Sequence, residues 1–167
     1  MADPTVNGVA HGATAADAGE VLAEVAMGIG WARSGDRAGA RLLFAALWER
    51  VGAHGDALCR CAIAHSMADV MDDPRAELRW DLRALDAARE LEDGRLAEAG
   101  MAVTTAGLFP SLHLNLGDAY RRAGDREQAL VHLHAGREAL GRLPPDDGAA
   151  QVRDGLDRLA RRLEEDR

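Results

Sequence analysis

The 167-residue sequence contains no lysine, so all 20 of its basic residues are arginine. Without lysine the protein can form no Schiff base with a cofactor aldehyde, and it has no phosphate-loop lysine. Aromatic residues make up only 4% of the chain while alanine is abundant. We therefore expect a core built from close helix contacts rather than from large rings. An excess of alanine and arginine also suggests a bacterial source with a GC-rich genome.

Blocks of positive charge are missing as well. The formal net charge is −8 at pH 7, and the arginines are scattered among acidic residues. Nucleic-acid backbones and negatively charged membranes bind proteins through clustered positive charge. We therefore expect no nucleic acid and no membrane among the partners.

The sequence also lacks a long apolar run, and we expect no leader segment. It has no stretch of about 18 apolar residues, and its first residues contain no basic region followed by an apolar core. Its two cysteines, Cys59 and Cys61, lie two apart on a predicted helix. Their side chains then point about 200° apart, so a mutual disulfide is not expected. These features predict a protein of the reducing cytoplasm.

The order of apolar residues predicts an all-α protein with one domain. Apolar residues recur at helical spacing along most of the chain, and the length fits a single domain. Residues 1–16 are small and polar, which predicts a disordered tail before a helical domain over residues 17–165. We expect helices over residues 16–32, 37–51, 57–71, 74–91, 95–104 and 148–165, two helices within 112–140, and a turn at Gly107 and Pro110.

The stretch 112–140 is the most informative part of the sequence. Its first half carries apolar residues at helical spacing, and Leu116 is expected in the core between two helices. Gly124 can end the first helix in a left-handed conformation, which glycine adopts without steric cost. Asp125 can then cap the second helix by accepting its free backbone N–H groups. The pattern predicts a helix–turn–helix hairpin.

This hairpin resembles the tetratricopeptide repeat, a helix–turn–helix unit of about 34 residues with a Leu-Gly-x-x-Tyr signature. Leu116, Gly117 and Tyr120 match the signature, and Ala129 and Leu133 match the small and large positions of the second helix. The position that holds tryptophan in the family is His113 here, so the match departs from the pattern at that point.

A similarity between two segments of the chain supports a repeat architecture. Gly35, Asp36 and Arg37 followed by Ala40 parallel the sequence Gly-Asp-Arg at 124–126 followed by alanine. Residues 57–91 resemble a second, degenerate copy, and the segment before residue 112 is longer than the family's even spacing allows. The resemblance implies a short right-handed α-solenoid of about three hairpins, completed by a capping helix over residues 148–165 with one apolar side.

The resemblance also implies a function. In the family, the first helix of each repeat lines a concave groove that binds peptides. We expect neither a cofactor nor a metal ion in this protein. The protein is therefore expected to be a non-catalytic module that binds a protein or peptide partner. Carried over by position, the residues expected in or beside the groove are Val25, Ile29, Arg33, Cys61, His65, Asp69, Leu114, Asn115, Asp118 and Arg122.

Cys61, His65 and Asp69 also permit an alternative with a different chemistry. They occur at every fourth residue and so share one face of a helix. Such a series could supply a thiol nucleophile, a base and its orienting acid, or metal ligands. A stripe on one straight helix rarely surrounds a single reacting atom, however, and no oxyanion donor is evident. A small helical enzyme or small-molecule-binding protein is the alternative function.

A further alternative concerns the oligomeric state. Exposed faces of the terminal helices could form a homodimer, so the protein is expected to be either a monomer or a homodimer.

The histidines are not spaced for metal binding. His132 and His134 face different ways on their helix, and His113 has no partner at ligand spacing. We therefore expect no histidine metal site and a surface position for His113.

Overall fold

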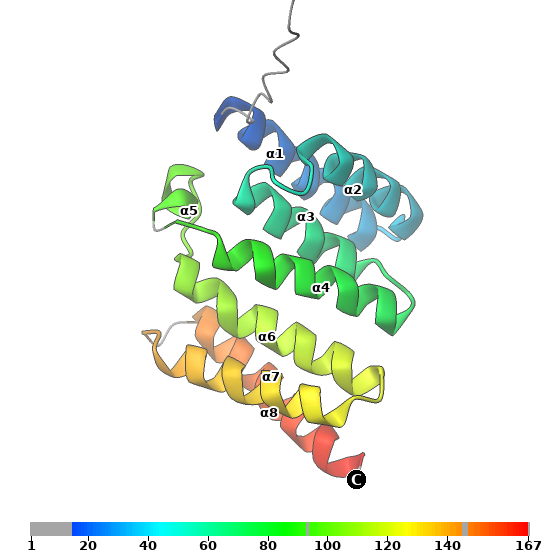
Figure 1. Ribbon diagram of the computed structural model, residues 1–167, viewed down its shortest axis with the longest axis vertical. Helices are drawn as coiled ribbons and strands as arrows, with labels where there is room; N and C mark the ends of the chain where they lie inside the picture. Colours follow the sequence, from blue (N-terminus) through cyan, green and yellow to red (C-terminus); the bar gives the residue numbers. More distant parts are fainter. Residues whose placement is uncertain (1–14, 93, 145–146, 167) are drawn as a thin grey trace, which may run out of the picture.

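The structure, a computed structural model, describes residues 15–92, 94–144 and 147–166. All regular structure in these ranges is helical, which confirms the all-α class (Figure 1). The predicted tail over residues 1–16 lies outside the described residues, except that Ala15 and Ala16 begin the first helix. The helices are α1 (Ala15–Arg33), α2 (Arg37–Val51), α3 (Ala57–Asp69), α4 (Pro74–Arg89), α5 (Arg95–Glu98), α6 (Thr105–Arg122), α7 (Arg126–Gly141) and α8 (Asp147–Glu165).

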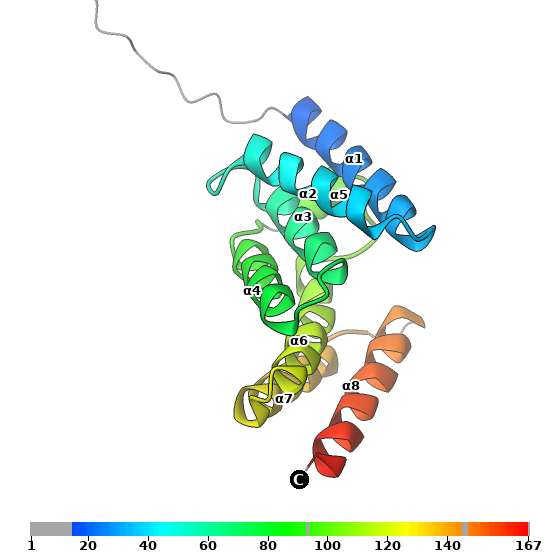
Figure 2. The same cartoon turned by 90° about the vertical axis from the view of Figure 1, so that its right-hand side faces the viewer.

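Six of the helices form three hairpins that lie side by side along the molecule. The hairpins are α1–α2, α3–α4 and α6–α7, and neighbouring hairpins meet through α2 with α3 and through α4 with α6. Helix α8 packs against α6 and α7 at the end of the molecule that is farthest from α1 and α2 (Figure 2). No helix in the described ranges is long and apolar enough to cross a bilayer.

The first and third hairpins turn in the same way, as the Gly-Asp-Arg sequences at 35–37 and 124–126 predict. Gly35 and Gly124 adopt positive φ angles of 101° and 84°, where a side chain would be strained. The Asp36 carboxylate accepts a hydrogen bond from the Gly39 N–H at 2.8 Å and caps α2. Asp125 caps α7 in the same manner, accepting from the Gln128 N–H at 3.0 Å. The turn residues therefore fix where both second helices begin.

Small residues allow the hairpin helices to approach closely, as the high alanine content predicts. Ala40, Ala84 and Ala129 are fully buried on the second helices of the three hairpins. A Cβ atom on Gly28 of α1 would lie 2.5 Å from the Phe44 ring of α2, so only glycine fits there. Leu116 has no exposed surface, which confirms its predicted place in the core.

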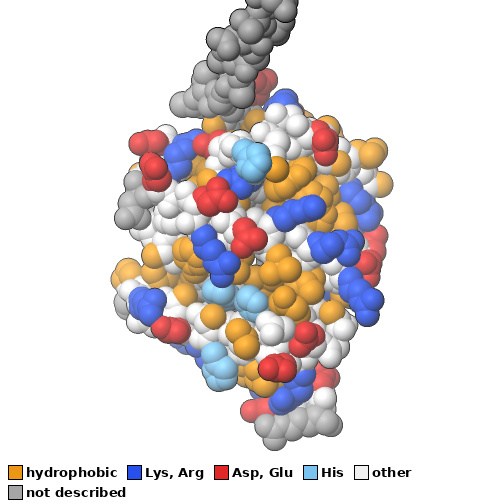
Figure 3. All heavy atoms as spheres, in the orientation of Figure 1, with side chains coloured by type: hydrophobic (Ala, Val, Ile, Leu, Met, Phe, Trp, Pro, Cys, Tyr) orange, Lys and Arg blue, Asp and Glu red, His pale blue; other side chains and the backbone are white. Residues whose placement is uncertain are grey.

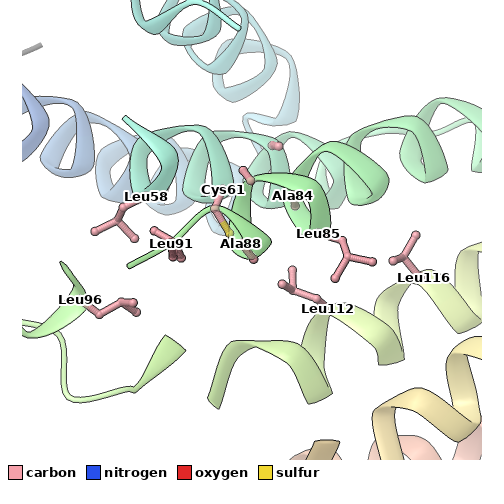
Figure 4. Packing of buried hydrophobic residues seen from close by; sticks show 11 residues of the cluster. Leu58, Cys61, Ala84, Leu85, Ala88, Leu91, Leu96, Leu112 and Leu116 are labelled. Atoms are coloured by element: carbon pink, nitrogen blue, oxygen red, sulfur yellow. The ribbon is translucent and has the colours of Figure 1, made fainter. Parts of the chain in front are cut away.

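The central core lies between α3, α4 and α6. Figure 4 shows its aliphatic side chains between the α3–α4 hairpin and α6, with Leu96 of α5 beside Leu58 and Leu91. Because Leu96 is only 2% exposed, the segment after α4 is anchored in the core rather than loosely attached. The cluster comprises Leu58, Cys61, Ala64, Ala84, Leu85, Ala87, Ala88, Leu91, Leu96, Leu112 and Leu116.

The predictions for residues 92–110 are wrong in detail. The short helix ends at Glu98 instead of residue 104, and Gly107 and Pro110 lie within α6 instead of forming a turn. The reason is local, because Thr104 accepts a hydrogen bond from the Gly107 N–H at 3.2 Å and caps α6. Pro110 is also buried in the core. Helices α3 and α4 each end two residues earlier than predicted, at Asp69 and Arg89.

An ion pair positions the segment 94–104 between α4 and α6, which we call the insertion. The Arg95 guanidinium donates two hydrogen bonds to one carboxylate oxygen of Asp56, at 2.8 and 3.1 Å. Asp56 also accepts from the Cys59 N–H at 2.8 Å and caps α3. These hydrogen bonds hold the pKa of Asp56 below its usual value, although burial acts in the opposite direction. The insertion is therefore fixed against the first turn of α3.

Candidate functional site

A mostly apolar pocket of about 400 Å³ opens between α1, α3, the inserted segment and α6. Val25 and Ile29 come from α1, Cys61 and His65 from α3, and Met101 from the insertion. We call it the anchor pocket. Its complete lining is Leu22, Val25, Ala26, Ile29, Leu58, Cys61, Ala62, His65, Ser66, Ala99, Met101, Leu108, Ser111 and Leu112.

A second pocket of about 320 Å³ adjoins the first along the same two helices. Ile29, His65 and Ser66 line both pockets, while Arg33 and Asp69 line the second only. We call it the polar pocket, and the two together the groove. The structure thus brings six of the ten predicted groove residues together: Val25, Ile29, Arg33, Cys61, His65 and Asp69.

Three of the four predicted groove residues on α6 lie outside both pockets. Leu114 packs into the apolar cluster beneath α8. Asp118 accepts a hydrogen bond from Arg122 at 2.9 Å and another from Arg121 at 3.1 Å. Arg122 also binds both carboxylate oxygens of Glu77, at 2.8 Å for one of them. These ion pairs raise the pKa of Arg122 above its usual value, although burial opposes the shift. The apolar side chain of Leu114 and the charged groups of Asp118 and Arg122 thus already have partners within the fold.

Asn115, the fourth residue, reaches the groove through a single contact. Its amide nitrogen lies 3.4 Å from Nδ1 of His65, which bridges α6 and α3. If the amide donates, His65 carries its proton on Nε2, since a neutral imidazole has one donor and one acceptor nitrogen. In that orientation the contact favours one tautomer of the histidine that lines both pockets.

Cys61, His65 and Asp69 share a face of α3, but no hydrogen bond joins them to one another among the described residues. Cys61 is 6% exposed, and burial raises the pKa of its thiol to about 11. Because the thiolate is the nucleophile, a neutral thiol at physiological pH is a poor one. Among the described residues, His65 makes its hydrogen bond to Asn115 and not to Cys61. The geometry favours Cys61 as a small wall residue of the anchor pocket.

Two buried polar features escaped the sequence analysis. The first is Asp81 on α4, which is 1% exposed and whose two carboxylate oxygens have no hydrogen-bond partner among the described residues. Burial, together with the nearby carboxylates of Glu77 and Asp69, raises the pKa of Asp81 to about 8. One signal was available, because Asp81 falls in register with the buried stripe of Ala84, Leu85 and Ala88.

The second is a pair of histidines between α6 and α7, in which His132 is buried and His113, predicted at the surface, is half-buried. Its Nδ1 atom lies 2.9 Å from Nδ1 of His132, and the Tyr120 ring stacks on His132 at a centroid distance of 5.3 Å. Burial and the positive charges nearby lower the pKa of His132 to about 4 and also lower that of His113. In the described part of the chain, no three His, Cys, Asp or Glu side chains converge in a way that could hold a metal ion.

Charges of both signs are mixed over the surface. Red and blue side chains alternate on the face in Figure 3, and pale-blue histidines gather in its lower half, where α6 and α7 lie. Most arginines pair with carboxylates, as Arg41 does with Asp72 at 3.1 Å and Arg137 with Asp157 at 2.8 Å. Arg33 makes no ion pair within the described ranges, so its charge remains available in the groove.

Comparisons with known proteins do not assign the chain to a family. No protein-family model matches it. No solved structure matches it either. It is 38% identical over 88 residues to a histidinol-phosphatase of Mycobacterium tuberculosis. That similarity covers 48% of this chain and 33% of the relative, so the chain spans about a third of the relative's length.

Proposed function

We propose that the protein is a non-catalytic interaction module that binds a segment of a partner protein in the groove over α1 and α3. The observation that carries the proposal is the pair of adjoining pockets, which together present apolar and charged walls along both helices. A continuous groove of this kind suits an extended chain, whose side chains alternate between two sides and whose backbone needs hydrogen-bond partners.

The arrangement of the hairpins supports the same proposal. Three hairpins follow one another, and the first and third use matching glycine turns and aspartate caps. A Cβ atom on Gly117 would lie 2.6 Å from Leu159 of α8 and 3.5 Å from the Ala129 carbonyl oxygen of α7, so a small residue is needed between these helices. We therefore interpret the fold as a short solenoid similar to tetratricopeptide repeats, with α8 as its capping helix.

Helix α8 limits where a partner can bind. Its buried leucines, Leu156, Leu159 and Leu163, pack on the last hairpin and form one cluster with Leu133. Leu114 packs against the same cluster, so the face of α6 that carries Leu114 is covered by α8 and is closed to a partner. The binding site that we propose is accordingly confined to α1, α3, the insertion and the beginning of α6.

A second candidate function follows from the size of the anchor pocket. Its volume of about 400 Å³ lies within the range of small-molecule sites. A small apolar ligand would fill this pocket alone and would leave the charged walls of the polar pocket unused. A thiol-dependent enzyme has less support, since the Cys61 thiol is buried and its pKa is raised.

We also propose a cytoplasmic location, because both cysteines are free thiols.

The test is to block the groove without disturbing the core. Ala26 lines the anchor pocket from an exposed position on α1, so Ala26→Trp should fill the pocket from its rim. Ala23→Trp adds the same side chain to an exposed position of the same helix outside the pockets. A partner captured from a lysate of the source organism is identified by mass spectrometry, and its binding segment is titrated calorimetrically.

We expect Ala26→Trp to abolish binding of that segment and Ala23→Trp to leave it unchanged. Equal binding to both variants would place the partner elsewhere and reject the proposal. If a purified small apolar compound from the same lysate bound in place of the segment, and Ala26→Trp blocked only that compound, the second candidate would replace the first.

A further inference from the structure

We infer that the partner segment carries one bulky apolar side chain, which enters the anchor pocket, and an acidic side chain three or four residues away, which meets Arg33. This inference rests on the proposed function and adds the chemistry and the spacing of the ligand. It concerns an internal segment of a partner protein, with no free chain end required.

The insertion, residues 94–104, makes the anchor pocket selective for an apolar group. Ala99 and Met101 of the insertion face the walls supplied by α1 and α3 across the pocket. The Arg95–Asp56 ion pair and the buried Leu96 hold the insertion in place. The pocket is therefore a preformed feature, and binding need not order its walls.

The few polar groups of the anchor pocket are mostly engaged elsewhere. Ser111 donates its hydroxyl to the Leu108 carbonyl oxygen at 2.9 Å, and His65 contacts Asn115. A polar side chain inserted among the remaining aliphatic walls would lose its water without gaining partners, which is costly. An aliphatic or aromatic side chain of the partner meets no such penalty and gains the burial of its apolar surface.

The polar pocket supplies the charge complementarity. Its two arginines differ, because Arg37 contacts the Asp72 carboxylate at 3.5 Å whereas Arg33 has no ion-pair partner among the described residues. A carboxylate from the partner would complete a charge-assisted hydrogen bond with Arg33. Asp69 lies on the opposite wall, where it can accept hydrogen bonds from backbone N–H groups of the same segment.

The spacing follows from the two helices that form the groove. Val25 and Cys61 line the anchor pocket. Arg33 follows Val25 by eight positions along α1, and Asp69 follows Cys61 by eight positions along α3. Eight residues of α-helix span about 12 Å. An extended segment advances about 3.3 Å per residue, so three to four residues separate the anchor from the acid.

The experiment is a display selection against the intact chain. A library of random twelve-residue segments, fixed at both ends by constant flanking sequence, offers no free carboxyl terminus. The enriched segments are expected to share a Leu, Ile, Met, Phe or Trp and an Asp or Glu three or four residues away. Synthetic versions with the same flanks are then measured by fluorescence polarisation against four variants.

Two of the variants alter the groove and two are matched controls. Ala26→Trp and Arg33→Glu should each weaken binding of the enriched segments at least tenfold. Ala23→Trp and Arg79→Glu should leave it within twofold, since Ala23 and Arg79 are exposed residues outside the groove. Arg79→Glu changes the net charge by the same amount as Arg33→Glu.

Three results would overturn the inference. These are segments without the paired apolar and acidic residues, segments whose binding is insensitive to Arg33→Glu, and no enrichment at all. The proposed function is judged separately by the captured partner. If that partner is lost with Ala26→Trp while the selection fails, the groove binds a segment of different chemistry, and only the present inference is wrong.

Discussion

The Nδ1 atoms of His113 on α6 and His132 on α7 lie 2.9 Å apart and join the two helices of the last hairpin. A hydrogen bond between two Nδ1 atoms requires a proton on one and a lone pair on the other. The neutral pair therefore contains one histidine of each tautomer. Gly136 contributes to this contact, because a Cβ atom there would lie 3.3 Å from Cβ of His113.

This pair predicts a loss of stability in mild acid. Burial lowers the pKa of His132 to about 4, below its ordinary value of 6.5. Between these two values the unfolded chain takes up a proton that the folded protein refuses, so folding becomes less favourable as the pH falls. The full effect is at most about 3 kcal/mol. Above pH 6.5 the pair imposes no such penalty.

The measurement is urea unfolding of the parent and of His132→Gln at pH 7.5, 6.0 and 5.0. The parent should lose more free energy of unfolding over this range than His132→Gln, which cannot bind the proton. His134→Gln, at an exposed position two residues further along the same helix, should follow the parent. Parallel pH profiles for all three proteins would show that His132 titrates as an ordinary histidine in the fold.

Asp81 predicts the opposite dependence on pH. Burial, Glu77 and Asp69 raise the pKa of Asp81 to about 8, and Arg122 opposes them in part. The folded protein therefore keeps a proton that the unfolded chain releases above pH 3.8, and stability falls as the pH rises from there to about 8. Asp81→Asn removes the ionisation while preserving the shape of the side chain.

Asp81→Asn should match the parent near pH 4 and be more stable by several kcal/mol at pH 8. Denaturant unfolding at both pH values measures the difference. The exposed Asp154 on α8 provides a control, since Asp154→Asn should give the same small change at either pH. A parent protein that is at least as stable as Asp81→Asn at pH 8 would mean that Asp81 is ionised and compensated in the fold.

The contact of Gly28 with Phe44 predicts a contrast between two glycines of α1. A Cβ atom on Gly28 would lie 2.5 Å from the Phe44 ring, whereas one on Gly19 would meet nothing within 4 Å. Gly28→Ala should destabilise the protein by about 1–3 kcal/mol because the buried ring must move. Gly19→Ala should be neutral or stabilising by up to about 1 kcal/mol, from helix propensity alone. Thermal unfolding of both variants would refute the close contact if they shifted the midpoint equally.

Local chemistry made most of the fold predictable. The Gly-Asp pairs at 35–36 and 124–125 specify a left-handed residue followed by a cap, so the ends of the helices that they join were readable. The apolar spacing around Leu116 likewise depends only on residues close in sequence. Helix α2 accordingly begins and ends at the predicted residues, Arg37 and Val51.

The insertion was harder to predict because its conformation depends on distant partners. Leu96 is buried by Leu58 and Leu91, and Arg95 is held by Asp56, which is far away in the sequence. Gly107 and Pro110 are turn residues by composition, yet tertiary packing places them in a helix. The anchor pocket depends on this insertion, so the sequence could predict residues of its α1 and α3 walls but not the pocket itself.

The four predicted residues on α6 show the same limit. Leu114, Asp118 and Arg122 share one face of α6 because they are spaced by four residues, but a pattern within α6 contains no information about what covers that face. Leu114 is covered by α8, and Arg122 is bound by Glu77 of α4. His113 and His132 are likewise joined only by the packing of two helices.

The two arginines of the predicted groove should now behave differently. Arg33 lines the polar pocket without an ion pair among the described residues, while Arg122 is held by Glu77 and Asp118. Arg33→Glu should weaken binding of the captured partner by about 1–3 kcal/mol, through the loss of a charge-assisted hydrogen bond. Arg122→Glu should instead destabilise the fold, because it adds a third carboxylate between Glu77 and Asp118.

Calorimetric titration of the partner, paired with thermal unfolding of each variant, separates these effects. Arg33→Glu should keep the parent's midpoint and lose affinity, and Arg122→Glu should lower the midpoint while the folded fraction keeps its affinity. Cys61→Ser retains the size of the side chain and should change the affinity little, since the buried thiol serves as a wall of the anchor pocket. Its hydroxyl should lower the midpoint, because a polar group buried among aliphatic side chains is costly. Complete loss of binding with Cys61→Ser, together with parental binding by Arg33→Glu, would reject the groove in favour of a thiol-dependent function, because only thiol chemistry distinguishes sulfur from oxygen so sharply at that position.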